Sequence, residues 1–170
     1  TKSGLSAAFF ILANMKTYAV TEALEKLRHY CAYQERCHKE VKDKLYGMKM
    51  IPEAVDQIVG TLVAENYLNE SRFAQQFARG KFSIKNWGKL RITRELKARA
   101  VSDYDIRKAV LAIDDKSYLK KIDTISTKKW KQLEGNTLQV RKQKLFQYLA
   151  YRGWENHLIY AQIDVLSATN

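Results

Sequence analysis

The sequence predicts an all-α fold, built as an elongated array of three tandem three-helix repeats that resemble helix-turn-helix units. Apolar residues recur at helical spacing nearly throughout the chain, and no stretch alternates with a period of two for long enough to indicate a sheet. The chain has one proline, Pro52, and no linker rich in glycine, serine or proline. A set of apolar positions also recurs about every fifty residues, as in other repeat proteins.

The repeat is defined by six apolar positions that keep their register three times. The members of the second set follow those of the first after 51 residues, and the members of the third set follow after a further 53. The three sets are Val41, Leu45, Met50, Val55, Val59 and Leu62; Ile92, Leu96, Val101, Ile106, Val110 and Ile113; and Leu145, Leu149, Trp154, Ile159, Ile163 and Leu166. A chance register of leucines in a helical protein is the alternative interpretation.

Residues 1–20 are expected to form an N-terminal extension, and residues 21–68 the first repeat. The apolar run Leu5–Ala13 is too short to span a bilayer. It also resembles the apolar part of a signal peptide, but no small-residue cleavage pattern follows it. The first repeat opens with a helix near Glu22–Tyr33, and Pro52 starts a later helix with Glu53 in its first turn.

Residues 69–115 and 116–170 are expected to form the second and third repeats. Their leading helices are predicted near Glu70–Phe82 and Lys116–Lys131. Ser102 is suited to cap a helix in the second repeat, and Asp114-Asp115 indicates another helix start.

Positive charge is concentrated in the second and third repeats. The formal net charge of the chain is +12, and the three repeats carry −1, +5 and +6. The segment from Arg79 to Arg99 contains eight basic residues and one acidic residue, Glu95. Such a density favours a polyanionic partner, either nucleic acid or a strongly acidic protein surface, although a solvated face is the simpler alternative.

The candidate binding residues lie in these two repeats. On the helix predicted to begin near Trp87, Ile92 and Leu96 are expected to face inward, which leaves the basic side chains on the remaining surface. Lys81 and Lys85 are expected in the turn before this helix. In the third repeat the basic residues indicate either a second contact surface or a lysine-rich solubilising helix. The candidates are Lys81, Lys85, Trp87, Lys89, Arg91, Arg94, Lys97, Lys128, Lys129, Arg141 and Lys144.

Other motifs are weaker. Trp87-Gly88, in a turn between two helices, suits either stacking on a base or packing at a helix junction. Cys31 and Cys37 lie near two histidines, but the spacing is poor for zinc, and we expect buried cysteines and no metal site. No catalytic motif is present, so neither an enzyme nor a cofactor is predicted. Two cysteines favour a reducing compartment, the cytoplasm.

A longer pattern resembles a known family. The stretch Asn66–Ala74, followed by Trp87-Gly88, Arg91-Ile92 and Glu95-Leu96, is similar to the core of the RecX family, bacterial regulators of the RecA recombinase. The resemblance covers about Tyr18–Leu166 and is strongest in the second repeat. It implies three tandem three-helix repeats. The family-pattern residues are Arg72, Phe73, Trp87, Gly88, Arg91 and Glu95, most of which are expected to maintain the fold. Glu70-Ser71 stands where the pattern often has an aspartate.

The resemblance also implies a function. Family members bind RecA nucleoprotein filaments in the filament groove and lower ATPase and strand-exchange activities. We therefore expect a monomeric, non-enzymatic regulator that binds the RecA filament through its basic face, contacts DNA weakly and non-specifically, and does not engage membranes. The alternatives are a tandem helix-turn-helix protein that acts directly on DNA and a protein-interaction array without DNA affinity.

Overall fold

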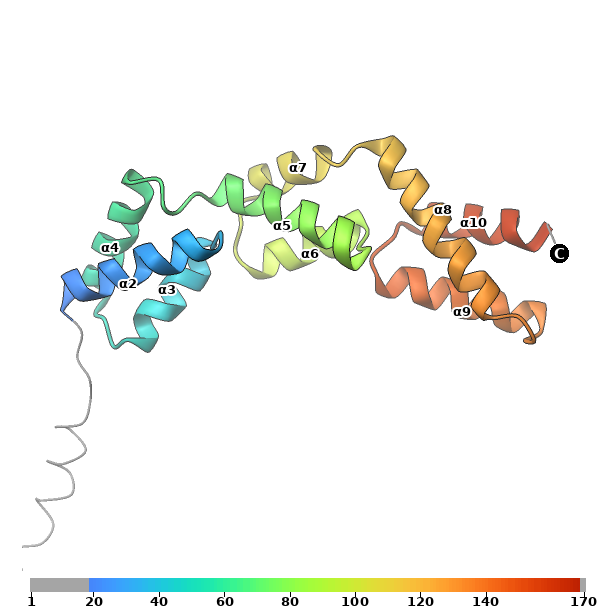
Figure 1. Cartoon of the computed structure of the whole chain (residues 1–170), viewed down its shortest axis with the longest axis horizontal. Helices are drawn as coiled ribbons and strands as arrows, with labels where there is room; N and C mark the ends of the chain where they lie inside the picture. The colour runs from blue at the N-terminus through green and yellow to red at the C-terminus, as the bar shows by residue number, and fades with distance from the viewer. Residues whose placement is uncertain (1–18, 169–170) are drawn as a thin grey trace, which may run out of the picture. The chain divides into compact units, whose positions relative to one another are not determined.

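The computed structural model describes residues 19–168, and within them all regular structure is α-helical. This confirms the predicted fold class. None of the helices between residues 19 and 168 combines the length and the apolar composition that crossing a bilayer requires. In chain order the helices are α2 (Val20–Tyr33), α3 (His38–Gly47), α4 (Pro52–Ala64), α5 (Glu70–Lys85), α6 (Lys89–Ala98), α7 (Asp103–Leu111), α8 (Asp115–Gln132), α9 (Leu138–Tyr151) and α10 (Asn156–Ala168) (Figure 1). The predicted signal-like run at Leu5–Ala13 lies outside the described residues.

The helices pack in groups of three. In repeat 1, α4 contacts both α2 and α3, and in repeat 2, α7 contacts both α5 and α6. In repeat 3, α8, α9 and α10 all contact one another. The chain divides into two compact units between Asn69 and Glu70, so that repeat 1 forms one unit and repeats 2 and 3 share the other.

The repeated apolar positions form the core of each repeat. Fourteen of the eighteen positions are buried, and the other four, Met50, Val59, Val110 and Leu166, are half-buried. The residues of one column therefore occupy equivalent places in three small cores. This confirms that the internal register reflects a structural repeat and not a chance spacing of leucines.

The turn between the second and third helices is also repeated. Lys49, Ala100 and Gly153 have φ angles of 64°, 56° and 79°, in the left-handed region. After each of them, the next backbone N–H donates to a carbonyl five residues earlier, as in Met50 to Leu45, with an N–O distance of 3.2 Å in all three repeats. This bond is the signature of a Schellman motif, which ends the second helix and reverses the chain.

The predicted helix starts are confirmed. Pro52 occupies the first turn of α4. The Ser102 hydroxyl accepts a hydrogen bond from the backbone N–H of Asp105, 3.1 Å away, and the Asp114 carboxylate accepts one from Ser117 N–H at 2.8 Å. That bond lowers the pKa of Asp114, because it stabilises the ionised carboxylate at the start of α8.

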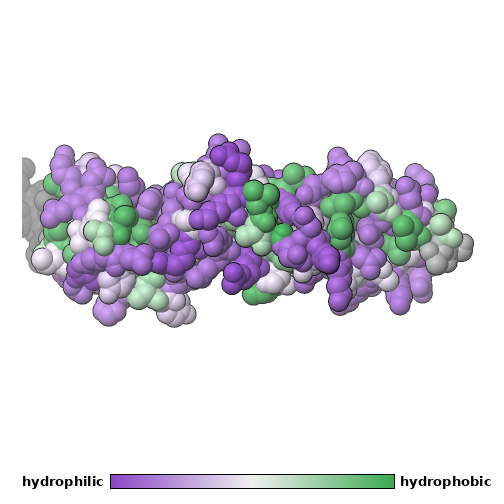
Figure 2. All heavy atoms as spheres, turned by 90° about the horizontal axis from the view of Figure 1, so that it is seen from above, coloured by the Kyte–Doolittle hydropathy of each residue, from purple (hydrophilic) through white to green (hydrophobic). Residues whose placement is uncertain are grey.

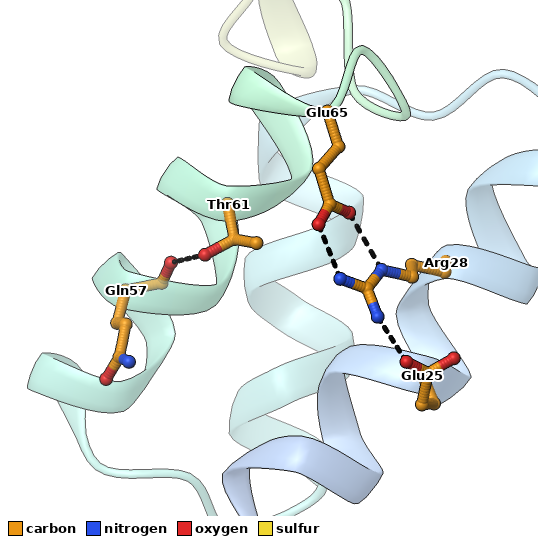
Figure 3. A network of polar contacts seen from close by, with 5 residues as sticks. All are labelled: Glu25, Arg28, Gln57, Thr61 and Glu65. Atoms are coloured by element: carbon orange, nitrogen blue, oxygen red, sulfur yellow. Dashed lines mark hydrogen bonds and ion pairs between the residues drawn. The ribbon is translucent and has the colours of Figure 1, made fainter.

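In repeat 1, a polar network ties α2 to the end of α4 (Figure 3). The Arg28 guanidinium donates two hydrogen bonds to Glu65, one of them from Nε at 2.7 Å, and a third to Glu25. Glu65 directly follows α4, where the partial negative charge of the helix end opposes a carboxylate. The guanidinium offsets this repulsion, and its hydrogen bond lowers the pKa of Glu65.

Repeats 2 and 3 meet where two glycines bring their backbones together. The N–H of Gly88 donates to the Arg152 carbonyl at 2.9 Å, and the N–H of Leu90 donates to the Gly153 carbonyl at 3.1 Å. A Cβ atom added to Gly88 would lie 2.3 Å from the Gly153 carbonyl oxygen, and one added to Gly153 would lie 2.3 Å from the Arg91 backbone nitrogen. The close approach therefore requires glycine on both sides.

Aromatic rings fill this junction. Trp154 is only 1 % exposed, and its indole N–H donates to the Asn86 carbonyl at 3.1 Å. The Trp154 ring lies 4.4 Å from that of Tyr118, which in turn lies 5.7 Å from that of Phe82. The Tyr118 hydroxyl accepts from the Lys89 backbone N–H and donates to Glu155. Burial, the main cause, raises the pKa of this hydroxyl, so it remains a donor at neutral pH.

We predict that Gly88→Ala destabilises the unit formed by repeats 2 and 3 by about 1–3 kcal/mol, because the new methyl group forces the two backbones apart. The three tryptophans of the chain, Trp87, Trp130 and Trp154, all belong to this unit. Urea unfolding followed by tryptophan fluorescence therefore measures its stability selectively. Gly80→Ala is the matched control: it lies inside α5 with open space around its Cβ position, and alanine there should raise stability by about 0.5–1 kcal/mol. Equal effects of the two substitutions would contradict the close approach.

We predict that Glu65→Gln loosens repeat 1 at pH 7, and that this effect shrinks as pH falls into the acidic range. Because the pKa of Glu65 is lowered in the folded chain, its ion pair stabilises the fold above the unfolded pKa, and this contribution is lost as pH falls through the folded value. Amide hydrogen exchange in α2 and α4, compared with the unsubstituted chain at each pH, checks this. A difference that does not shrink at all as pH is lowered stepwise would show that the carboxylate charge is not what matters.

Candidate binding surface on repeats 2 and 3

The basic segment of repeat 2 is arranged differently from the prediction in one respect. Helix α5 continues to Lys85, so Lys81 and Lys85 lie in its last two turns and not in the turn before the next helix. The residues beyond the predicted end at Phe82 include Ser83, whose carbonyl accepts a hydrogen bond from Lys121 Nζ of repeat 3 at 3.3 Å. A contact between repeats accompanies the longer helix, and the spacing of apolar residues within one repeat does not reveal it.

Several of the candidate side chains form a ladder in which cations alternate with aromatic rings. Lys81 Nζ lies 5.2 Å from the centroids of both Phe77 and Trp87. The Arg91 guanidinium lies 4.1 Å from the Trp87 ring and 4.7 Å from that of Tyr151. We call Phe77, Lys81, Trp87, Arg91 and Tyr151 the cation–aromatic ladder; it connects α5 and α6 of repeat 2 to the end of α9 in repeat 3.

Arg91 and Lys89 also bond across the junction. Arg91 Nη1 donates to the Tyr151 carbonyl at 2.9 Å. Lys89 Nζ pairs with the Asp115 carboxylate at 2.9 Å and lies 4.6 Å from the Tyr118 ring. These two predicted binding residues therefore hold repeats 2 and 3 together, which limits how far their charges are available to a partner.

Other cations of repeat 2 are open to solvent. Within residues 19–168, the exposed side chains of Lys85 and Arg94 form no ion pair or hydrogen bond. Lys97 is exposed as well, but its Nζ lies 3.4 Å from Asp103. As predicted, Ile92 and Leu96 are fully buried. Among the predicted candidates of repeat 2, the cations most available to an anionic partner are therefore Lys85 and Arg94.

In repeat 3, too, some candidate cations contact other groups of the chain and others do not. The Arg141 guanidinium stacks on the buried Trp130 at 4.1 Å, and Lys129 Nζ lies 5.3 Å from the Tyr148 ring. Lys144 Nζ donates to the Asn136 side chain at 3.3 Å. Of the four candidates here, Lys128 alone is exposed without such a contact in the described part of the chain.

The sequence prediction named the cations but missed most of their aromatic partners. Phe77, Tyr118 and Tyr151 were not among the candidates. A signal was present for one contact of the ladder, since Phe77 and Lys81 have the four-residue spacing that places side chains together on a helix face. Trp87 lies in the connection between two helices, so its contact with Arg91 does not follow from helical spacing. Tyr118 and Tyr151 belong to the next repeat, and only the tertiary structure brings them to the site.

The structure also places Trp87 and the two cysteines that the sequence analysis considered. Trp87 is half-buried in the connection between α5 and α6, with its ring 6.3 Å from that of Phe77. Cys31 and Cys37 are 5 % and 0 % exposed, as expected for core cysteines. Among residues 19–168, no three His, Cys, Asp or Glu side chains are grouped to hold a metal ion.

The fold and the surface define a class of protein: tandem three-helix repeats that present a basic face. Comparison with known proteins is more specific. Residues 69–110 match the family description "RecX, second three-helix domain", and residues 118–163 match "RecX, third three-helix domain". Together the two matches span more than half of the chain, and they correspond to α5–α7 and α8–α10. The chain belongs to the RecX family.

Individual relatives support the same family. "Regulatory protein RecX" from Oceanobacillus iheyensis is 24 % identical over 141 residues, which cover 83 % of this chain and 52 % of the relative. The protein of the same name from Listeria welshimeri is 24 % identical over 151 residues, covering 89 % and 55 %. This chain thus spans about half the length of these curated relatives, which are named as regulatory proteins.

Solved structures support the fold. "Crystal structure of RecX from Lactobacillus salivarius" has a TM-score of 0.77 and 21 % identity to this chain, and the match covers 88 % of this chain and 97 % of that one. "Crystal structure of regulatory protein RecX" also has a TM-score of 0.77, at 18 % identity, covering 96 % and 80 %.

We predict that Arg91→Ala and Arg94→Ala differ in their effects on stability, although both remove one positive charge from α6. Loss of Arg91 removes two aromatic contacts and a hydrogen bond between repeats, and should cost about 1–2 kcal/mol. Arg94 is exposed, and its loss should change stability by less than about 0.5 kcal/mol. Urea unfolding followed by tryptophan fluorescence measures both. A destabilising Arg94→Ala, or a neutral Arg91→Ala, would contradict the division into bonded and open cations.

Proposed function

We propose that this chain regulates the RecA recombinase: it binds RecA nucleoprotein filaments through the basic face of repeats 2 and 3 and lowers their ATPase and strand-exchange activities. It does so as a monomer in the cytoplasm, without a cofactor and without catalysis of its own. The observation that carries the proposal is the presence of exposed, unbonded cations on the repeats that match the RecX family. The family's regulatory role supports the same assignment.

The arrangement of the cations suits an extended anionic partner. Side chains in the cation–aromatic ladder already lose much of their conformational freedom on folding, so holding them in place costs little on binding. Lys85 and Arg94 extend from this ordered base into solvent. A partner therefore meets a surface whose charge is fixed in position, with open cations free to form ion pairs.

Binding of this kind regulates by favouring one state of the filament. A ligand shifts a conformational equilibrium only through its different affinities for the two states. If the basic face binds better to the nucleotide state that does not turn over, ATP hydrolysis slows. Repeats that contact more than one RecA protomer at once would strengthen the effect, since the second contact becomes intramolecular.

Direct action on DNA is the alternative function. Each repeat contains a pair of short helices joined by a tight turn, such as α6 and α7, and this pair resembles a helix-turn-helix unit. A DNA-binding factor would show a sequence preference that survives moderate salt in the absence of RecA. A filament regulator would bind DNA alone weakly, without sequence preference, and lose that binding as salt rises.

We predict that the double substitution Lys85→Glu with Arg94→Glu raises the concentration needed for half-inhibition of RecA ATPase by about tenfold or more, because two attractive contacts become repulsive. Helicity and unfolding midpoint should stay unchanged, since both side chains are exposed and unbonded. The measurement is ATP hydrolysis by RecA on single-stranded DNA, titrated with each variant.

The matched control is Lys49→Glu with Lys108→Glu. It makes the same change in net charge at two exposed residues that are not among the binding candidates, Lys49 of repeat 1 and Lys108 of α7. We expect it to inhibit like the unsubstituted chain. If both double variants lose inhibition equally, total charge matters and not the proposed face; if neither loses it, the surface is wrong.

A further inference from the structure

A groove separate from the predicted candidates lies between α5, α7 and α8. It consists of two hollows of about 210 and 360 Å³ that share Phe82 and Ser117 in their walls. The first also includes Arg79 and Asp114, and the second includes Lys120 and Lys121. None of these residues is among the binding candidates from sequence, so the groove is an independent feature of the surface.

The aromatic stack of the junction ends in this groove. It starts at the buried Trp154, passes through Tyr118, and reaches the half-buried Phe82 in the groove wall. Tyr118, which itself packs against Trp154, contacts the Phe82 ring from within. The ring is therefore a preordered surface on which a further flat ring can stack.

The polar groups around this ring are mostly cationic or hydroxylic. Within the described residues, the exposed side chains of Arg79 and Lys120 form no ion pair or hydrogen bond. Lys121 Nζ lies 5.6 Å from the Phe82 centroid and donates to the Ser83 carbonyl at 3.3 Å. The one carboxylate among the lining residues, Asp114, accepts a hydrogen bond from Ser117 N–H.

On the face of the molecule shown in Figure 2, hydrophilic side chains cover most of the surface, and hydrophobic patches lie between them. In this groove a hydrophobic ring lies directly among cations. An acidic protein surface would satisfy the cations but has no special use for an aromatic ring. Duplex DNA keeps its bases stacked inside the helix, out of reach of Phe82. An unpaired strand offers both a phosphate chain and free base faces.

We infer that the groove between α5, α7 and α8 binds single-stranded nucleic acid, with an unpaired base stacked on Phe82 and the phosphates on either side of it paired with Arg79, Lys120 and Lys121. Ser117 and Thr124, which also line the groove, supply hydroxyl groups toward the backbone. The inference needs no partner protein. It therefore stands or fails separately from the proposed binding to RecA.

The test measures binding of the whole chain to a fluorescein-labelled oligothymidine single strand by anisotropy, without RecA and over a series of salt concentrations. Phe82→Leu keeps the apolar bulk of the side chain but removes the aromatic face, and should weaken binding about tenfold. Affinity for a duplex of equal length should not change. An equal loss for duplex, or no loss for the single strand, would overturn the stacking contact.

Charge is tested with Lys120→Gln and Lys121→Gln together. Loss of two phosphate contacts should weaken binding and make the slope of log K against log salt shallower by about 1.4 for a single strand. The matched control, Lys108→Gln with Lys131→Gln, removes two exposed lysines outside the groove and should leave the slope unchanged. If both pairs change the slope alike, binding is diffuse and the groove is not the site.

Two further measurements locate the ligand and secure the result. A strand carrying 5-iodouracil should cross-link to Phe82 on irradiation, and a cross-link confined to other residues would contradict the inference.

A poly-glutamate peptide that binds as tightly as the oligonucleotide would assign the groove to an acidic protein instead. Tryptophan fluorescence during urea unfolding shows whether Phe82→Leu leaves the fold intact; if it does not, the cross-link to the unsubstituted chain decides.

Discussion

The arrangement of repeats 2 and 3 depends on the contact of two backbones at Gly88 and Gly153. Because neither residue has a side chain, the connection between α5 and α6 lies directly against the residues that follow α9. Two backbone hydrogen bonds join the two segments there, from Gly88 N–H to the Arg152 carbonyl and from Leu90 N–H to the Gly153 carbonyl. This proximity brings Tyr118 within reach of Lys89 and places Arg91 against Tyr151. The complete cation–aromatic ladder is therefore a product of packing between repeats, because Tyr151 comes from repeat 3 and the other four residues from repeat 2.

The cations of that surface have two distinct tasks. Lys89 and Arg91 contact other groups of the same chain: a carboxylate, a carbonyl and aromatic rings. Lys85 and Arg94 have no such partners in the described part of the chain. A dense basic segment can therefore remain stable, because part of its charge is stabilised internally. The rest is exposed on the same repeat and remains available to an anionic partner.

The sequence predicts the fold well because each core is built from local helical periodicity. All eighteen repeated positions are buried or half-buried, and Pro52, Ser102 and Asp114 begin helices as their side chains dictate. The site is harder to predict. The last turn of α5, the role of Tyr118 and the groove beside Phe82 all arise from contacts between residues about thirty or more positions apart. Periodicity within one helix does not indicate such contacts. A charged residue that bonds across the junction therefore cannot be distinguished in the sequence from one that faces solvent.

The central claim is that the open cations of repeat 2 contact the RecA filament, and lysine acetylation footprinting tests it most directly. The chain is acetylated with and without RecA filaments assembled on single-stranded DNA, and the rate at each lysine is measured by mass spectrometry. The account predicts that the filament slows acetylation of Lys85, whereas Lys49, an exposed lysine of repeat 1, reacts at the same rate in both cases. An unchanged rate at Lys85 in a chain that is bound to the filament would contradict the account.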